Sequence, residues 1–393
     1  MGMSSSSEVL IVGAGPAGLA LALSLARAGL RVAVLEQQSE AMLAEAADDG
    51  REIALHHASM QMLETLGVLA ELQAEQIAPI TAARVANGRS SRFLDFKPKS
   101  AQAPAIGYLI SNHLIRRALY RQLQNEPSIR LLCEQRMRSV QRSEAQAGVL
   151  TDQGEHQAQL LVAADSRHSA TRQALGIAAH MHDFGKTMLV CRAEHALDHE
   201  GIAWEWFDLP RTIAALPLHG RCVSLAITLP HAEAEQLATM PEARFNETIC
   251  QWLEHRLGPM RLVSPRWRYP LIATYAQRFI APRAALVGDA AVGMHPVTAH
   301  GYNFGLHSQQ LLTQVLLQSQ RRGLDLADAS ALRRYERRHR AYTLPLFLAT
   351  NAIVDLYTSR EPVARFARDL GIALSSRLPP FKQAVLRQLT RGA

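Results

Sequence analysis

The sequence predicts an α/β fold: a parallel sheet, an inserted and mainly antiparallel sheet, and a helical C-terminal region. Three observations support it. Residues 9–36 read as strand, glycine turn, helix and strand. A second buried strand, a glycine-rich loop and a helix follow Ala284. Between about residues 186 and 276, short runs such as WEWFD, TIAALPL and CVSLAIT alternate apolar and polar residues, which is typical of antiparallel strands.

The first predicted elements form one compact strand–helix–strand unit. Val9–Val12 is predicted to be a buried strand, Pro16–Ala28 a helix that Gly29 ends, and Arg31–Glu36 a second apolar strand. This order within thirty residues is the mononucleotide-binding half of a Rossmann-like sheet.

Further elements follow from periodicity. We expect helices over Ala58–Leu72 and Ile115–Gln124 and strand-like alternation over 129–165. Residues 328–393 are predicted to be helical and Arg-rich, with breaks at Pro345, Pro362 and Pro379–Pro380.

These elements predict a discontinuous cofactor domain. It comprises residues 1–75, 101–180 and 277–335, and the substrate domain comprises 76–100 and 181–276. Residues 336–393 form the C-terminal helical region.

Composition excludes several classes of protein. The 393 residues carry a formal net charge of +7 but no basic run long enough to suggest nucleic-acid binding. The four cysteines, at 133, 191, 222 and 250, have no CxxC spacing, so we expect neither disulfides nor a zinc site. The sequence shows no signal peptide and no apolar run of membrane-spanning length. A cytoplasmic protein is expected.

The first turn has the residues of a dinucleotide site. In GAGPAG, Gly13 permits the tight turn, Gly15 admits a pyrophosphate to the backbone next to Pro16 and Ala17, and Gly18 lets the helix pack on the strand. Glu36, at the end of the second strand, is expected to bind ribose hydroxyls and to repel a 2′-phosphate. This motif leaves NAD and FAD open.

The loop after Ala284 decides between them. Gly288-Asp289 follows the strand, a His295-Pro296 turn comes next, and Gly301-Tyr302-Asn303 begins a helix. A second carboxylate and a second helix N-terminus are superfluous for NAD, whereas the ribityl chain and ring of FAD need such supports. The predicted cofactor is therefore FAD.

These motifs resemble the class A flavoprotein monooxygenases, which have the para-hydroxybenzoate hydroxylase fold. The similarity covers nearly the whole chain. It rests on GAGPAGLALALSLARAGLRVAVLE, DGREIALHHASMQMLETLGV, NHLIRRAL, LLVAADSRHSATRQALGI and GDAAVGMHPVTAHGYNFGL. The tail LRRYERRHRAYTLPLF is similar to the ubiquinone-biosynthesis hydroxylases (the UbiH/UbiF/VisC group), and GMHPVTAHGYNFGL and WEWFD resemble its UbiM branch.

The resemblance implies a function. Arg51, Asn112 and Asp165 would join the cofactor-binding residues. The protein would be a FAD-dependent aromatic-ring hydroxylase that uses transient NAD(P)H and O2, through a flavin C4a-hydroperoxide, on a polyprenyl phenol or quinol of ubiquinone biosynthesis. Another flavoenzyme of this fold, a reductase or a hydroxylase of a different aromatic, is the alternative. A non-catalytic scaffold that retains FAD is a third.

Two positions depart from the family pattern. Ser166 stands where the family usually has glycine, and Ala299-His300-Gly301 replaces Gly-Gln-Gly. No nucleophile, triad or metal site is expected. If the phenol needs a base, His300 and His295 are the candidates because they flank the flavin loop. For His295 a purely structural role in the turn before proline is the preferred reading, and for His300 the two readings are balanced.

The substrate is expected to be a small aromatic molecule, with or without a prenyl chain. Trp204, Trp206, Leu216 and Pro217 are candidate liners of its pocket, and ordinary sheet core is the competing reading for each. Residues 377–391 read as a basic amphipathic helix that either docks on the cofactor domain or lies on the membrane surface. Association of the protein with the membrane surface or with a biosynthetic complex is therefore considered.

Overall fold

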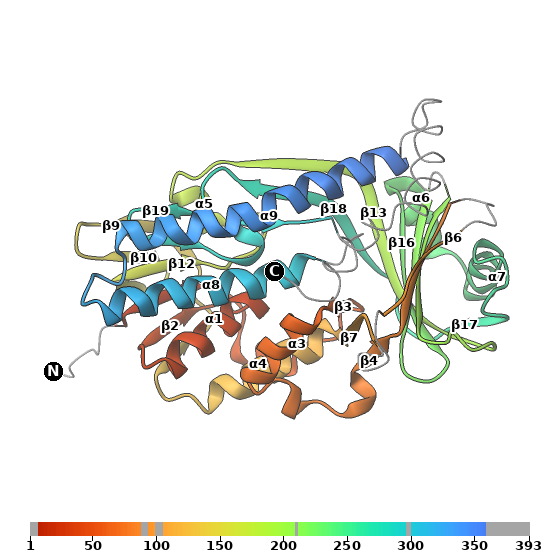
Figure 1. Cartoon of the computed structure of the whole chain (residues 1–393), viewed down its shortest axis with the longest axis horizontal. Helices are drawn as coiled ribbons and strands as arrows, with labels where there is room; N and C mark the ends of the chain where they lie inside the picture. Colours follow the sequence, from red (N-terminus) through yellow and green to blue (C-terminus); the bar gives the residue numbers. More distant parts are fainter. Residues whose placement is uncertain (1–6, 88–92, 99–104, 209–210, 296–299, 359–393) are drawn as a thin grey trace.

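The computed structural model describes residues 7–87, 93–98, 105–208, 211–295 and 300–358 (Figure 1). Pro296, Pro362, Pro379–Pro380 and the predicted amphipathic helix 377–391 lie outside the described residues.

A six-stranded sheet occupies one half of the molecule. Its order is β19-β20-β12-β1-β2-β8, and all pairs are parallel except β19–β20. The strands are β1 (Val9–Val12), β2 (Val32–Leu35), β8 (Ile129–Leu132), β12 (Leu160–Ala163), β19 (Ile280–Ala281) and β20 (Ala284–Leu286). The predicted parallel sheet is thereby confirmed, including the return of the chain to it at Ala284.

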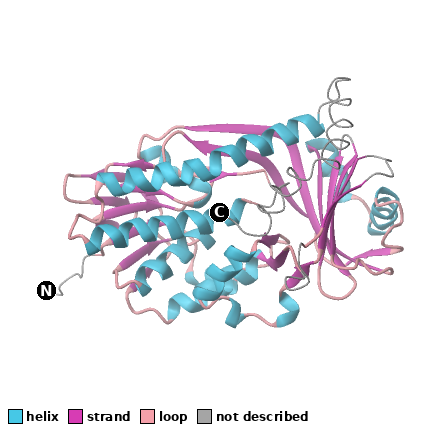
Figure 2. Cartoon of the chain, in the orientation of Figure 1, coloured by secondary structure: helices cyan, strands magenta, loops and turns pink. Residues whose placement is uncertain are grey.

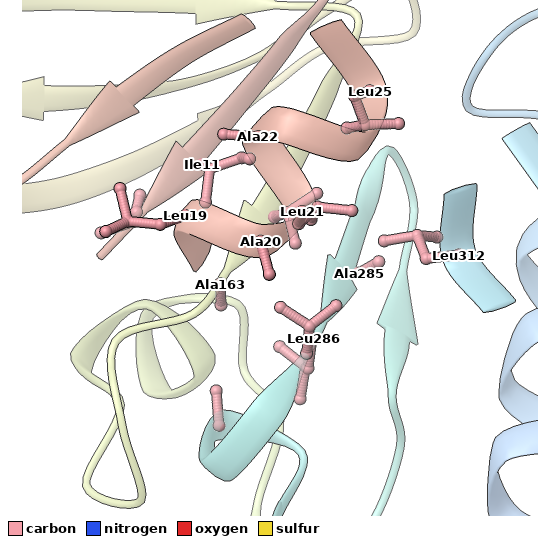
Figure 3. Close-up of a cluster of buried hydrophobic side chains, with 14 of the residues drawn as sticks. Ile11, Leu19, Ala20, Leu21, Ala22, Leu25, Ala163, Ala285, Leu286 and Leu312 are labelled. Carbon is pink, nitrogen blue, oxygen red and sulfur yellow. The ribbon is translucent and has the colours of Figure 1, made fainter. Parts of the chain in front are cut away.

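Helices cover this sheet (Figure 1). They are α1 (Pro16–Arg27), α4 (Asn112–Gln124), α8 (Gly301–Arg321) and α9 (Ala329–Thr358). Figure 3 shows Leu21 and Leu25 of α1 in one apolar cluster with Leu286 of β20 and Leu312 of α8. All four side chains are fully buried. Because these residues come from both ends of the sequence, the core itself joins the two glycine motifs.

A larger sheet forms the other half (Figure 2). It contains nine strands in the order β21-β18-β13-β16-β15-β14-β5-β6, with β17 beside β13. Only β5–β14 is parallel, so the predicted antiparallel sheet is confirmed. The strands are β5 (Ala82–Asn87), β6 (Phe93–Phe96), β13 (Ala179–His195), β14 (Ile202–Asp208), β15 (Arg211–Pro217), β16 (Cys222–Pro230), β17 (Met260–Leu262), β18 (Trp267–Ala276) and β21 (Val292–Gly293).

Two helices in this region were not predicted. They are α6 (His231–Thr239) and α7 (Glu242–Trp252), each of which starts after a proline. Phe245 and Ile249 of α7 belong to the same buried cluster as Trp206 and Leu225 of the large sheet. Figure 1 places α7 on the side of that sheet that faces away from the parallel sheet.

Smaller elements complete the two halves. One three-stranded sheet consists of β3 (Glu52–Leu55), β7 (Gly107–Ser111) and β4 (Ala78–Ile80), and another of β9 (Met137–Arg142), β10 (Ala147–Thr151) and β11 (Gly154–Ala158). The remaining helices are α2 (Glu40–Glu45), α3 (His57–Thr65), α5 (Ala170–Ala174) and the 3₁₀ turns η1 (Leu69–Glu71), η2 (Ala74–Gln76) and η3 (Gly288–Ala290).

Two helix predictions were wrong. The helix expected over Ala58–Leu72 ends at Thr65, because Gly67 adopts a φ of +73° that no α-helix continues. Pro345 does not break α9, which continues from Ala329 to Thr358. Proline removes one helical hydrogen bond, but Tyr335 and Phe347 are buried on either side of it and hold both halves of the helix in the core.

The predicted domain boundaries stay a prediction. Two observations support the assignment of residues near 82–87 to the substrate domain: β5 pairs with β14, and Ala86 belongs to the large sheet's core cluster. Among the described residues, no helix combines the length and the apolar character needed to cross a membrane.

A half-buried histidine, His307, and a buried one, His339, join α8 to α9. Nδ1 of His307 lies 3.1 Å from Nδ1 of His339, so one ring donates a hydrogen bond to the other. Burial, followed by the nearby His56, lowers the pKa of His307 from 6.5 to about 4. The pKa of His339 is lowered well below 6.5 for the same main reason. Both rings are therefore neutral in the folded protein at pH 7.

This burial predicts acid sensitivity. Between pH 6.5 and 4 the unfolded chain protonates His307 while the folded protein does not, so stability is lost as the pH falls through this window. The full shift corresponds to about 3 kcal/mol. We expect His307→Gln to flatten the dependence of Tm on pH in thermal melts, whereas His219→Gln, in an exposed turn, leaves it unchanged. Equal slopes for His307→Gln and the wild type would contradict the prediction.

Candidate cofactor and substrate site

A cavity of about 680 Å³ lies between the parallel sheet and the large sheet. Its walls on one side are loops that follow β1, β12 and β20, which is where ligands bind in parallel α/β sheets. Its other side is a face of the large sheet. Of the residues predicted to bind the cofactor, the following line the cavity: Gly15, Pro16, Ala17, Arg51, Asn112, Gly288, Asp289, Gly301 and Tyr302.

The glycines of the first turn differ in what surrounds them. A Cβ on Gly13 would lie 2.6 Å from the Ala164 carbonyl oxygen, and Gly13 has a φ of +107°. A Cβ on Gly18 would lie 2.0 Å from the Gly13 carbonyl oxygen. Both positions are closed to a side chain by the protein itself. A Cβ on Gly15 would meet nothing within 4 Å in the part of the chain that the structure describes, and Gly15 lines the cavity, so the open side of the turn faces it.

Glu36 lies beside this turn and outside the cavity lining. Its Oε2 accepts a hydrogen bond of 2.8 Å from the Ala14 amide, and its Oε1 accepts one of 2.9 Å from the Gln38 amide. Each carboxylate oxygen keeps a further acceptor position. The predicted contact with ribose is compatible with this arrangement and stays a prediction.

The second motif meets the first across the cavity. Gly288 has a φ of +59°, and a Cβ there would lie 2.9 Å from Cβ of Ala17. Asp289 follows in η3, and its Oδ2 accepts a hydrogen bond of 3.2 Å from Arg167. Neither α1 nor α8 has a side-chain cap at its N-terminus. Two uncapped helix N-termini therefore border one cavity, an arrangement that favours an anionic ligand.

Arg51 is held at the cavity wall. Its guanidinium donates to Asp49 Oδ2 at 2.6 Å and lies 5.3 Å from the Tyr269 ring centroid. Burial would lower the pKa of Arg51, but the bond to Asp49 outweighs it and raises that pKa. Asn112 donates to the same Asp49 oxygen at 2.7 Å. Asp49 therefore fixes both predicted cofactor contacts on this side.

Three predicted residues turn away from the cavity. Asp165 accepts hydrogen bonds from the Ser169 hydroxyl and, at 2.9 Å, from the Thr171 amide at the start of α5. Asn303 donates to the Ala54 carbonyl at 2.9 Å and so ties α8 to β3. His300, just before α8, is buried and lies 5.8 Å from the Phe304 ring. In this structure, therefore, the cavity does not include Asp165, Asn303 or His300.

His295 lines the cavity, unlike His300. Its ring meets Phe184 edge-on at 4.7 Å. Burial, followed by the charge of Lys186, lowers its pKa from 6.5 to about 4. At neutral pH it is an uncharged ring and a weak base.

The large sheet presents its alternate residues to the cavity. Leu216 lines it, but Trp204 and Trp206 face the opposite side, where they pack in the core cluster beneath α7. Pro217 is not part of the lining either. The residue between the two tryptophans, Glu205, points into the cavity. The alternation in WEWFD was the signal for this, because a strand that buries both tryptophans turns the glutamate the other way.

Ser166 occupies a strained position at the cavity wall. Its φ is +74°, which glycine adopts freely and serine does not, and its side chain is exposed. The turn therefore has a backbone conformation that glycine would adopt without strain.

We expect Ser166→Gly to stabilise the protein. Removing the Cβ relieves the strain of the left-handed conformation, which stabilises the folded protein. Glycine also has more backbone entropy in the unfolded chain, which offsets part of this gain. The unfolding free energy should rise by about 0.5–1 kcal/mol in total. Denaturant unfolding measures the change. Gly176→Ser, at a φ of +72° on the surface, should lose stability by a similar amount, and a neutral Ser166→Gly would rule out strain at this position.

These features define a class of protein. A parallel-sheet glycine turn and a second glycine–aspartate loop enclose a cavity that an antiparallel sheet closes, as in the FAD-dependent α/β enzymes. The chain belongs to the FAD binding domain family, whose model matches residues 6–343. It is a member of the FAD-dependent monooxygenases and hydroxylases, so the predicted family and cofactor are confirmed.

Relatives place the chain more narrowly. It is 40% identical to ubiquinone hydroxylase UbiM of Neisseria meningitidis, over 99% of this chain and 85% of the relative. It is 35% identical to ubiquinone hydroxylase UbiL of Rhodospirillum rubrum, over 97% and 89%. With 3-demethoxyubiquinol 3-hydroxylase of Escherichia coli the identity is 28%, over 97% of both chains. The predicted likeness to the UbiM branch is confirmed.

Solved structures share the fold. The p-nitrophenol 4-monooxygenase PnpA of Pseudomonas putida superimposes with a TM-score of 0.77 and 17% identity, over 99% of both chains. PqsL of Pseudomonas aeruginosa, described as a probable FAD-dependent monooxygenase, gives 0.73 and 24%, over 94% of this chain and all of the other.

The residues present fit FAD. The open face of Gly15 and the uncapped start of α1 suit a pyrophosphate, and Asp289 and the uncapped start of α8 border the same cavity. At Gly301, a Cβ would meet no atom of the described residues within 4 Å.

Proposed function

We propose that the protein hydroxylates the aromatic ring of a polyprenyl phenol or quinol in ubiquinone biosynthesis, using FAD, NAD(P)H and O2. The observation that carries the proposal is the 40% identity with a ubiquinone hydroxylase over nearly the whole chain. The cavity adds support, because its substrate side is a sheet face of mostly small and apolar residues.

The protein's own residues position the reactants. Bound FAD would supply the redox chemistry, taking a hydride from NAD(P)H and activating O2. Gly15, the start of α1 and Asp289 would hold the nucleotide and ribityl parts, while Arg51, fixed by Asp49, would stand beside the ring. The large sheet bounds the cavity on the other side and would limit the access of water to the reacting atoms.

We also propose a cytoplasmic location at the inner membrane surface, because a polyprenyl substrate resides in the membrane. Association with other biosynthetic enzymes at the membrane would also bring the protein close to its substrate. The formal net charge of +7 supports attraction to an anionic surface.

The proposed function is tested with the FAD-loaded protein. A quinol precursor with a short prenyl chain should accelerate NAD(P)H oxidation and yield a product heavier by one oxygen atom from O2, detected by mass spectrometry after ¹⁸O₂ labelling. Deletion of the gene should accumulate the corresponding precursor. Flavin that NAD(P)H never reduces, with any phenol present, would instead support the FAD-retaining scaffold, which the strained Ser166 favours.

A further inference from the structure

Glu205 is the acidic residue on the substrate side of the cavity. It lies in β14, where it pairs with Val85 of β5 and Ala214 of β15. Across β15, Ala214 pairs with Ala226, which in turn pairs with Val190 of β13. Strands lie about 4.8 Å apart, so the two alanines beside Glu205 leave a shallow floor roughly 10 Å wide.

The floor suits an aromatic ring. Glu205, both alanines and Val190 all line the cavity. The rows on either side add hydroxyls from Thr212, Thr228 and Ser224. A ring that lies flat on the alanines would bring a hydroxyl at its edge to the Glu205 carboxyl. That carboxyl has no hydrogen-bond partner among the described residues, so it is free to accept one from a ligand.

The environment of Glu205 is uncharged. Burial alone raises its pKa from 4.5 to about 8. On the neighbouring strands, Arg84 and Arg211 face the other side of the sheet, where they lie over Trp204 and Trp252. Around the rest of the cavity stand the titratable residues Arg51, Glu52, Arg167, His168, Tyr269, Asp289, His295 and Tyr302. None of these neighbours is among the causes of the shift.

We propose that Glu205 is the base that accepts the proton of the substrate's ring hydroxyl, an assignment that rests on the proposed function. The O–H bond of the phenol breaks, a new O–H bond forms on the carboxylate, and the electron pair stays on the phenolate oxygen. The phenolate makes the ring electron-rich for oxygen transfer. As the product regains aromaticity, the ring carbon releases its proton to solvent and Glu205 returns its own to the oxygen.

Glu205 fits this task better than His295. A base works best when its pKa is close to that of the acid it deprotonates, and a phenol has a pKa of about 10. The pKa of Glu205, about 8, is within roughly two units of it, whereas that of His295 is about 4. His295 also follows β21, which four strands of the large sheet separate from the strand β14 that carries Glu205.

The test replaces Glu205 with glutamine, which has the same shape but accepts no proton. In the FAD-loaded enzyme with a short-chain prenylphenol, kcat should fall about 100-fold, in keeping with the loss of a general base. Substrate affinity, measured from the change in flavin absorbance, should stay within about threefold. The wild-type rise of kcat with pH towards 8 should disappear. Glu194→Gln replaces an exposed glutamate on β13 of the same sheet, and it should alter neither kcat nor the dependence of kcat on pH.

A fluorinated phenol that is already ionised at the assay pH distinguishes a base from a structural residue. It should restore most of the rate in Glu205→Gln, because no proton remains to be removed. An unchanged kcat and pH profile in Glu205→Gln, or no rescue by the ionised phenol, would overturn the assignment. If the wild type itself hydroxylates no phenol, the proposed function fails instead.

Discussion

Gly15→Ala is expected to give a folded protein that has lost its yellow colour. Gly15 has φ −71° and ψ 174°, which alanine adopts without strain, and a Cβ there meets no atom of the described residues within 4 Å. The unfolding free energy should change by less than about 0.5 kcal/mol. The new methyl group, however, fills the side of the turn where a pyrophosphate must approach the backbone. We expect FAD occupancy, measured by flavin released on denaturation, to fall at least tenfold.

Gly18→Ala is the matched comparison within the same motif. Its Cβ would lie 2.0 Å from the Gly13 carbonyl oxygen, so the turn itself must move. This variant should lose stability as well as FAD, by several kcal/mol if the strand and helix separate. A Gly15→Ala protein that retains stoichiometric FAD would show that the pyrophosphate does not approach this turn.

Asp289→Ala should likewise weaken FAD binding strongly while the fold survives. Among the described residues, the Asp289 side chain makes one ion pair, 3.2 Å to Arg167, and the two side chains are 33% and 30% exposed. Exposed pairs of this kind stabilise a protein by about 0–1 kcal/mol, so the loss of stability is small. A ribityl hydroxyl, by contrast, loses a charge-assisted hydrogen bond worth about 1.5–3 kcal/mol, which corresponds to a 10- to 100-fold weaker Kd.

Asp289→Asn separates the contribution of the negative charge of this residue from that of its hydrogen-bond acceptor. It keeps an acceptor oxygen but not the charge, and its FAD affinity, measured by fluorescence titration of the apoprotein, should lie between those of the wild type and Asp289→Ala. Full retention of FAD by the alanine variant would remove Asp289 from the cofactor site.

Much of the fold was predictable because local constraints and chain order agree. The glycine turn at Gly13–Gly18 needs a strand before it and a helix after it, and the apolar runs around it match both. The return at Ala284 was visible for the same reason. What periodicity cannot show is where tertiary packing overrides a local signal, as it does where α9 passes through Pro345.

Site residues could be predicted where a motif determines the backbone conformation. They were harder to predict where a side chain can form hydrogen bonds either with the cofactor or with another part of the protein. Gly15 and Gly288 line the cavity as expected, whereas Asp165 is occupied by α5 in a way that only three-dimensional contacts reveal. Glu205 was not predicted, because the candidate cavity residues in this strand were Trp204 and Trp206, and these lie on the opposite face of β14. Counting alternate residues from those tryptophans would have found it.

The order of strands in the parallel sheet also governs when the protein can acquire its cofactor. β20 pairs with β12, and α8 packs against α1, although about 120 residues separate β12 from β20 along the chain. During synthesis, β12 thus emerges long before β20. The edge of β12 that pairs with β20 stays open until residue 286 has left the ribosome. Loading with FAD is consequently a late event, and truncated chains that stop before α8 should be substrates for chaperones and proteases rather than flavoproteins.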